Sequence, residues 1–189
     1  MSKEVLQKAV EVLRGGGVVM HPTETCYGLA VDIFNEEAVK KLYELKGRDF
    51  DKPVSVLVDS LGMAQEYGIF SDKALELAQR YWPGPVSIVV PRKKRLPEFL
   101  NPGEGFISMR WSSKSVCTGL VENFGGPITT TSANLSGEAP AYSVEQFVGA
   151  DFVIDGGKLS ENRPSTIVKV EGEKITMLRQ GEVLVEEID

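Results

Sequence analysis

Two cations stand two residues apart at a predicted helix end, and hydroxyl-rich segments flank them in the sequence. Lys46 and Arg48 follow a helical pattern over 36–46, a Thr- and Tyr-bearing turn at 21–28 precedes them, and TTTSANLSG at 129–137 follows. Such cations could point together into a cleft and hold different oxygens of a polyphosphate. The alternative, which spacing alone favours, is a helix end whose cations complement the helix dipole. At a helix end, truncation of either should cost little stability.

The second half of the chain supplies a candidate partner loop. A strand predicted over 127–131 opens into small polar residues, among them Ser132 and Asn134. Strand ends of this kind often form ligand loops in α/β proteins, and the two side chains could offer a hydroxyl and an amide to one oxyanion. A polar turn that bonds its own backbone explains the same residues, and the sequence leaves both interpretations open.

Other catalytic groupings are missing from the sequence. There is no Walker A sequence, and the single histidine, His21, lacks the partners of a Ser/His/Asp triad. Cys26, Cys117 and one histidine are too few for a tetrahedral zinc site, so both cysteines are interpreted as small apolar residues. Glu24 could be a satisfied carboxylate at a helix start, and Tyr27 is more typical of a core. Any phosphate chemistry would therefore depend on cations, hydroxyls and Mg²⁺.

Composition limits the class of protein. The 189 residues predict one domain over 1–189, and the hydrophobic content of 42% is that of an ordinary globular protein. A net charge of −6 is unfavourable for generic nucleic-acid binding, with PRKKR at 91–95 as the clearest basic patch. There is no signal peptide and no apolar run long enough to cross a membrane, so the cytoplasm is the expected location.

Periodicity predicts the elements that must position these residues. We expect helices over 5–13, 36–46, 71–81 and 114–123, and strands over 18–20, 53–58, 86–90, 106–110, 127–131, 152–154, 166–170 and 174–178. The last two strands flank Glu171-Gly172-Glu173, a probable hairpin turn. Strands that alternate with helices early and end in a hairpin predict an α/β (α+β) fold with a mixed sheet.

Eight short motifs in order resemble one family. They are HPTETCYGL, ELKGR with Lys52-Pro53, WPGPVSIVV, SMR, TSANLSG, DGG, PSTIV and LRQGE, and the resemblance covers roughly residues 5–185. Each motif is weak alone, but eight in register resemble the YrdC/TsaC family of threonylcarbamoyl-AMP synthases, in the short form without an extra C-terminal domain.

The resemblance implies an open, twisted mixed sheet with flanking helices around a concave, basic cavity. It implies an enzyme that joins L-threonine, bicarbonate (as CO₂) and ATP into threonylcarbamoyl-AMP and pyrophosphate, with Mg²⁺ as cofactor. A tRNA threonylcarbamoyltransferase complex would then act on tRNA position 37. The implied site residues fall into two sets. Those for ATP are Lys46, Arg48, Ser132, Asn134 and Arg179, the first two being catalytic, and those for threonine are Thr23, Tyr27, Arg110, Thr130 and Ser165.

Two departures from the family pattern and two rival functions remain. Asp49 stands where the family usually has proline, and the strand PVSVLV lacks a histidine found in longer members. The first rival is a non-catalytic module that binds double-stranded RNA or tRNA, favoured by residues 92–95 and opposed by the net charge. The second is a carbamoyl-adenylate domain of hydrogenase maturation factors, which are much larger chains.

Overall fold

Residues 2–185 are described by the computed structural model, and within them nine strands form one mixed sheet in the order β7-β1-β2-β6-β3-β5-β4-β8-β9. The strands are β1 (Val19–Pro22), β2 (Tyr27–Ala30), β3 (Ser55–Val58), β4 (Val86–Pro91), β5 (Phe106–Trp111), β6 (Ile128–Ser132), β7 (Phe152–Val153), β8 (Thr166–Glu171) and β9 (Lys174–Arg179). The pairs β1–β7, β3–β5 and β4–β8 are parallel and the others antiparallel, which confirms the predicted mixed sheet.

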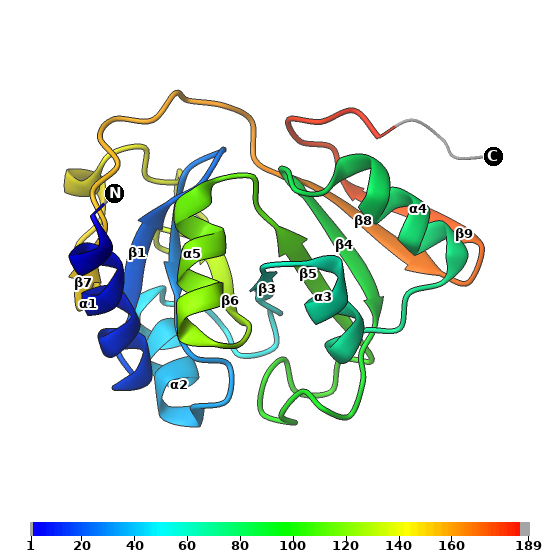
Figure 1. Ribbon diagram of the computed structural model, residues 1–189, viewed down its shortest axis with the longest axis horizontal. Coiled ribbons are helices and arrows are strands. Elements are labelled where there is room, and N and C mark those ends of the chain that lie inside the picture. The colour runs from blue at the N-terminus through cyan, green and yellow to red at the C-terminus, as the bar shows by residue number, and fades with distance from the viewer. Residues whose placement is uncertain (1, 186–189) are drawn as a thin grey trace.

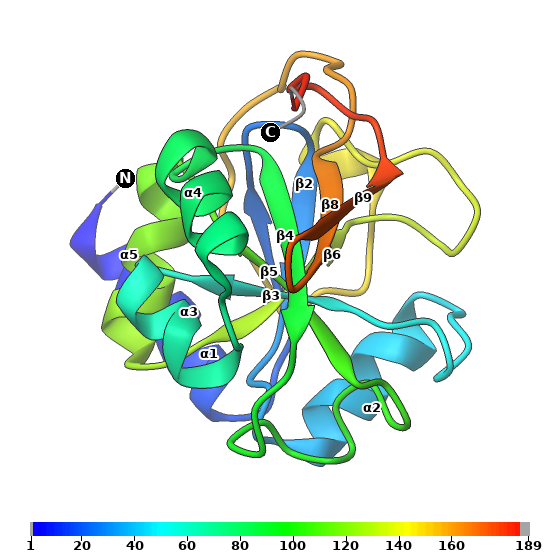
Figure 2. The ribbon, with the colours of Figure 1, turned by 90° about the vertical axis from the view of Figure 1, so that its right-hand side faces the viewer.

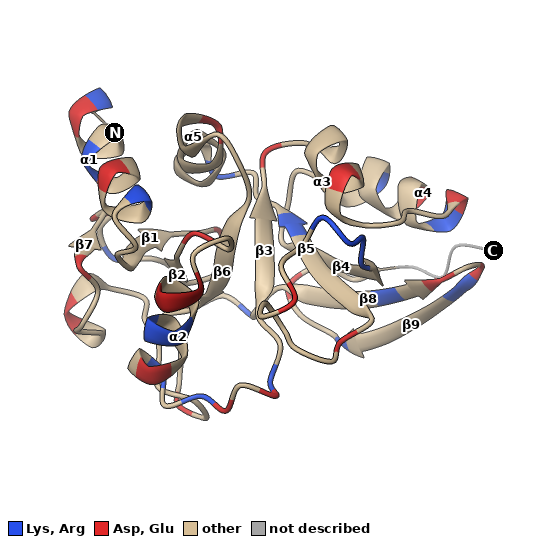
Figure 3. Cartoon of the chain, turned by 90° about the horizontal axis from the view of Figure 1, so that it is seen from below, with Lys and Arg blue, Asp and Glu red and all other residues tan. Residues whose placement is uncertain are grey.

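Helices flank this sheet on both faces. They are α1 (Lys3–Arg14), α2 (Glu36–Leu45), α3 (Leu61–Tyr67), α4 (Asp72–Tyr81), α5 (Ser115–Phe124) and a single 3-10 turn, η1 (Val144–Gln146). Figure 1 shows the order of the elements, and Figures 2 and 3 show α1, α3, α4 and α5 on one side of the sheet with α2 on the other. The four predicted helices, the eight predicted strands and the closing hairpin are therefore present, with bounds shifted by a few residues.

Two elements were missed from the sequence. Residues 22–28, predicted as a simple turn, contain the start of β2, which pairs antiparallel with β1 from Pro22–Tyr27 to Val19–Ala30. All four residues of β2 are buried. A strand covered on both faces shows no alternation of polar and apolar residues, so its pattern resembles that of a turn followed by a short apolar run. Helix α3 is only seven residues long and is capped by Ser60.

The core consists of two apolar clusters, the larger of which includes residues of α2, α3 and α4. The smaller contains Ala9, Leu13, Cys117 and Leu120 from α1 and α5, packed against Val19 of β1.

Helix α2 leads toward the candidate site. At its start, Asn35 accepts a hydrogen bond from Ala38 N, and after its end the chain turns at Gly47, which has φ +53. Among the described residues, no helix combines the length and apolar character needed to cross a bilayer.

Candidate functional site

A cavity of about 460 Å³ opens where strands from the two halves of the sheet meet. Its lining includes Arg48, Arg110 and Arg179, opposed by a single carboxylate, Glu138, among the described residues. The described lining therefore carries more cations than carboxylates. It brings together eight of the ten predicted site residues, namely Thr23, Arg48, Arg110, Thr130, Ser132, Asn134, Ser165 and Arg179.

Arg110 is the most enclosed cation of the cavity. It lies on β5 with only 5% of the residue exposed. One amino group of its guanidinium, Nη2, forms an ion pair with Glu24, while the buried Nε–H has no hydrogen-bond partner among the described residues. A buried donor without a partner is costly, so protein groups alone do not satisfy this guanidinium.

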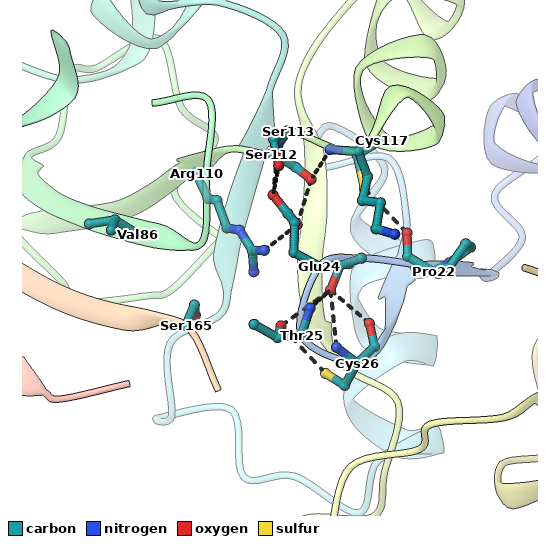
Figure 4. Close-up of polar contacts among 12 residues, drawn as sticks. Pro22, Glu24, Thr25, Cys26, Val86, Arg110, Ser112, Ser113, Cys117 and Ser165 are labelled. Atoms are coloured by element: carbon teal, nitrogen blue, oxygen red, sulfur yellow. Dashed lines mark hydrogen bonds and ion pairs between the residues drawn. The ribbon is translucent and has the colours of Figure 1, made fainter. Parts of the chain in front are cut away.

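Glu24 has a role that the sequence did not reveal. It lies in the loop between β1 and β2, and not at a helix start (Figure 4). Its Oε2 accepts from Ser112 Oγ at 2.8 Å, and its Oε1 accepts from Ser113 N at 2.6 Å and from Ser113 Oγ at 3.0 Å. Arg110 and these hydrogen bonds outweigh burial and lower the pKa of Glu24, so it is ionised at neutral pH.

Arg179 approaches the cavity from the edge strand β9. Its Nε donates to the Ser165 carbonyl oxygen and its Nη2 to Ser165 Oγ, both at 2.9 Å. Burial lowers the pKa of Arg179, and the nearby charge of Arg110 acts in the same direction. The arginine therefore orients Ser165 at the end of the segment that leads into β8, and both side chains line the cavity.

Lys46 lies behind the cavity wall. It is 1% exposed and does not line the cavity, because its ammonium donates to Ser132 O, Asn134 O at 2.8 Å and Asn134 Oδ1 at 3.2 Å. Its carbonyl in turn accepts from Ser136 N at 2.8 Å. All three N–H groups are used, so a direct contact with a ligand would require Nζ to give up one acceptor. Burial lowers the pKa of Lys46 to about 8.

Arg48 lines the cavity, whereas Lys46 does not. The Nε of Arg48 donates to Lys52 O at 3.1 Å and its Nη2 to Pro53 O at 2.9 Å. The prediction that the two cations point together into the cleft is therefore wrong, since only Arg48 lines the cavity. The expectation that truncation of either cation should cost little stability assumed exposed side chains, and Lys46 is instead buried with three acceptors. Asp49 is turned to solvent, where it accepts from Lys52 Nζ at 2.8 Å.

Ser132 and Asn134 lie at the end of β6, held by Lys46. Asn134 Oδ1 accepts from Ser132 Oγ and from Lys46, and its Nδ2 donates to the carbonyls of Leu135 at 2.8 Å and Glu138 at 2.9 Å. The two alternatives left open by the sequence are therefore both met in part: the segment bonds its own backbone, and both side chains still line the cavity.

The remaining predicted residues divide into cavity wall and core. Thr23 lines the cavity, but its hydroxyl donates to Cys26 O at 2.7 Å and so serves the β1–β2 loop. Thr130 lines the cavity from β6. Tyr27 is fully buried and outside the lining; its hydroxyl donates to Gly157 O and accepts from Gly156 N, both at 2.8 Å. Tyr27 thus fixes the DGG turn, in agreement with its interpretation as a core residue, and it lies outside the cavity where the resemblance implied a threonine contact.

Two further lining residues were not predicted from the sequence as site residues. Ser87 of β4 is 3% exposed and lines the cavity. Its signal was a lone serine within an apolar strand. Cys26 also lines the cavity, so its predicted apolar surroundings are wrong. Burial raises the pKa of both thiols, that of Cys117 to about 12, and neither is a thiolate at neutral pH.

His21 predicts a measurable loss of stability in acid. Burial lowers its pKa from 6.5 to about 4, so the unfolded chain binds a proton between these values that the folded chain does not. As the pH is lowered across this window, the free energy of unfolding should decrease, by up to about 3 kcal/mol relative to His21→Leu. Chemical denaturation of both proteins at pH 7, 5.5 and 4 checks this. Parallel pH curves for the two proteins would contradict it.

Comparison with known proteins assigns the chain to a family. Residues 11–181 match the Sua5/YciO/YrdC family model, described as "Telomere recombination". The threonylcarbamoyl-AMP synthase of Thiobacillus denitrificans is 36% identical over 168 residues, which cover 86% of this chain and 89% of that protein. The solution structure of MTH1692 from Methanobacterium thermoautotrophicum is 34% identical with a TM-score of 0.78, covering 100% of this chain and 91% of that one.

A longer relative has been solved with an amino acid. The crystal structure of Pyrococcus abyssi Sua5 complexed with L-threonine is 31% identical, with a TM-score of 0.87. The match covers 93% of this chain and 54% of that one, so this chain spans about half of the longer protein. The family model, the identities and the shared fold agree over nearly the whole sequence. The chain belongs to the Sua5/YciO/YrdC family.

Proposed function

We propose that this protein is a threonylcarbamoyl-AMP synthase. It converts L-threonine, bicarbonate and ATP into threonylcarbamoyl-AMP and pyrophosphate, and a tRNA threonylcarbamoyltransferase complex uses the product at tRNA position 37. The observation that carries the proposal is Arg110, a buried arginine in the cavity with a donor unused. It suits an amino-acid carboxylate, in a family whose Pyrococcus abyssi member was solved with L-threonine.

The cavity offers two regions for the two substrates. Arg110 receives the threonine carboxylate, with Ser165 and Thr130 in the same lining for its amine and hydroxyl. A site that hydrogen-bonds a substrate hydroxyl rejects analogues without it more strongly than an apolar pocket can. The nucleotide takes the region lined by Arg48, Ser132, Asn134 and Arg179. Lys46 acts from behind this wall, because it holds the two β6-end residues in place.

The reaction requires orientation and charge neutralisation more than a protein nucleophile. The threonine amine attacks CO₂ and loses a proton to give a carbamate, which decomposes readily in water. A carbamate oxygen then attacks the α-phosphorus of ATP, and pyrophosphate leaves. Arg48 and Arg179 neutralise charge that develops on the phosphates, and the side chains of the lining orient the reacting groups. Cys26, a protonated thiol in the lining, is not needed in this scheme.

Mg²⁺ fits this site as a companion of ATP. Within residues 2–185, no cluster of three or more His, Cys, Asp or Glu side chains could hold a metal ion. Phosphate oxygens and water are ordinary Mg²⁺ ligands. Glu138 is the one carboxylate among the described lining residues and could contribute a further ligand. When bound, Mg²⁺ supplies further neutralisation of phosphate charge.

The RNA-binding alternative is weaker because its basic patch is largely occupied. Arg92 donates to the carbonyls of Leu100 and Pro97, Lys93 donates to the carbonyl of Gln65, and Arg95 pairs with Glu66. Cations already held by protein groups offer less to phosphates, and the net charge of −6 adds repulsion.

The proposed function predicts pyrophosphate release that depends on both threonine and bicarbonate. We expect at least tenfold slower release when either is omitted, and serine should be a poorer substrate because it lacks the methyl group. The measurement is a coupled pyrophosphate assay with ATP and Mg²⁺, together with mass spectrometry of the adenylate. Equal release without any amino acid would overturn the assignment, and tight binding of tRNA without release would favour the RNA-binding module.

A further inference from the structure

The guanidinium of Arg110 has one protein partner on one of its edges. Its side chain is 6% exposed, that of Glu24 is 14% exposed, and the two form an ion pair through Nη2 and Oε2. The Nε–H lies on the same edge as Nη2 and has no partner among the described residues, so the edge that carries Nη1 is the one left for a ligand. Since the five N–H groups of arginine form a rigid planar fork, one fixed edge determines where the others point.

Glu24 is itself immobilised from the far side. Three donors from the segment after β5, Ser112 Oγ, Ser113 N and Ser113 Oγ, lie 2.6–3.0 Å from its two oxygens (Figure 4). With Arg110, each oxygen therefore accepts two hydrogen bonds, and the carboxylate has no freedom to rotate. Glu24 does not line the cavity, so it cannot itself contact a ligand there.

Arg110 would otherwise be poorly placed for binding. Arginine has many rotamers, and Arg110 and Arg179 share the cavity, where like charges repel. The Glu24 carboxylate offsets this repulsion and holds the guanidinium plane before a ligand arrives. A side chain that is already ordered loses less entropy on binding, which strengthens binding without any new contact.

We infer that Glu24 is a positioning residue for the amino-acid substrate, acting through Arg110 so that the free edge of the guanidinium meets the substrate carboxylate. The inference rests on the proposed function. It predicts that the affinity for threonine depends on Glu24, whereas the affinity for ATP does not.

Glu24→Gln tests this with almost no change of shape. An amide has one acceptor oxygen and one donor nitrogen, so either Arg110 or the Ser113 backbone then faces a donor. We expect the Kd and KM for threonine to rise roughly 10–100-fold, equivalent to about 1.4–2.7 kcal/mol, with the KM for ATP changed less than threefold. Binding by calorimetry and steady-state kinetics supply both readouts, and Glu24→Asp should recover part of the loss.

Asp151→Asn is the matched control. Asp151 also joins a cation and a backbone amide, since it pairs with Lys41 at 2.7 Å and accepts from Val18 N at 2.6 Å, but it lies outside the cavity lining. The control should lower the melting temperature without changing the threonine affinity. In an Arg110→Lys background, where the fork is already lost, Glu24→Gln should change threonine affinity less than threefold further.

The outcomes separate the two proposals. If the wild-type protein releases no pyrophosphate with threonine, the proposed function fails and this inference fails with it. If the wild type is active and Glu24→Gln only lowers the melting temperature, as Asp151→Asn does, the inference alone is overturned. An equal loss of ATP and threonine affinity, or full additivity in the Arg110→Lys background, also overturns it.

Discussion

Replacement of Arg110 by alanine should lower kcat/KM for threonine by roughly 100-fold or more. Hydrogen bonds to charged groups contribute about 1.5–3 kcal/mol each, and the substrate carboxylate would lose at least two. Arg110→Lys keeps the positive charge beside Glu24 but not the planar fork, so it should recover activity only in part. The measurement is kcat/KM with threonine varied at saturating ATP.

Stability must be controlled in this experiment, because Arg110→Ala also leaves the Glu24 carboxylate without its counter-charge. Loss of one partner of a buried ion pair costs roughly 3–5 kcal/mol, so the assay should run well below the melting temperature. Arg95→Ala is the matched control, since Arg95 pairs with Glu66 on the surface, where the side chains are 61% and 51% exposed. Near wild-type kinetics for Arg110→Ala would place the carboxylate site elsewhere.

Alanine at Lys46 and at Arg48 should have different effects, although the two residues are neighbours in sequence. Lys46→Ala removes the donor from three oxygens of Ser132 and Asn134. Buried acceptors without partners cost about 1–3 kcal/mol each, so we expect a loss of about 3 kcal/mol or more and a melting temperature lower by roughly 6–12 °C. Activity should fall as well, because the β6-end loop loses its support.

Arg48→Ala should leave the melting temperature nearly unchanged. Its bonds to Lys52 and Pro53 are at a partly exposed loop, where water can replace the guanidinium. If Arg48 meets developing phosphate charge, adenylate formation should fall roughly 30–1000-fold, equivalent to about 2–4 kcal/mol. The paired measurement is differential scanning fluorimetry with turnover of both variants. Equal melting of the two variants would contradict the different placement of the two cations.

Much of the fold and the site follows from local patterns in the sequence. The helix over 36–45 is predictable from Asn35, the apolar spacing and Gly47, because capping and periodicity act within a few residues. The hairpin at 171–174 is predictable from its glycine turn. The motifs that carry the family resemblance contain fifteen of the 21 described residues that line the cavity, although they come from distant parts of the chain.

Only the tertiary structure decided where these side chains point and what holds them. Lys46 and Arg48 look equivalent at a helix end, yet packing turns one beneath the β6-end loop and the other toward the cavity. Glu24 finds Arg110 and Ser113 because β1–β2 and β5 meet in space, 86 or more residues apart. Local sequence governs backbone preference, whereas burial and charge pairing depend on long-range contacts, and in this protein those contacts decide how each charged residue is used.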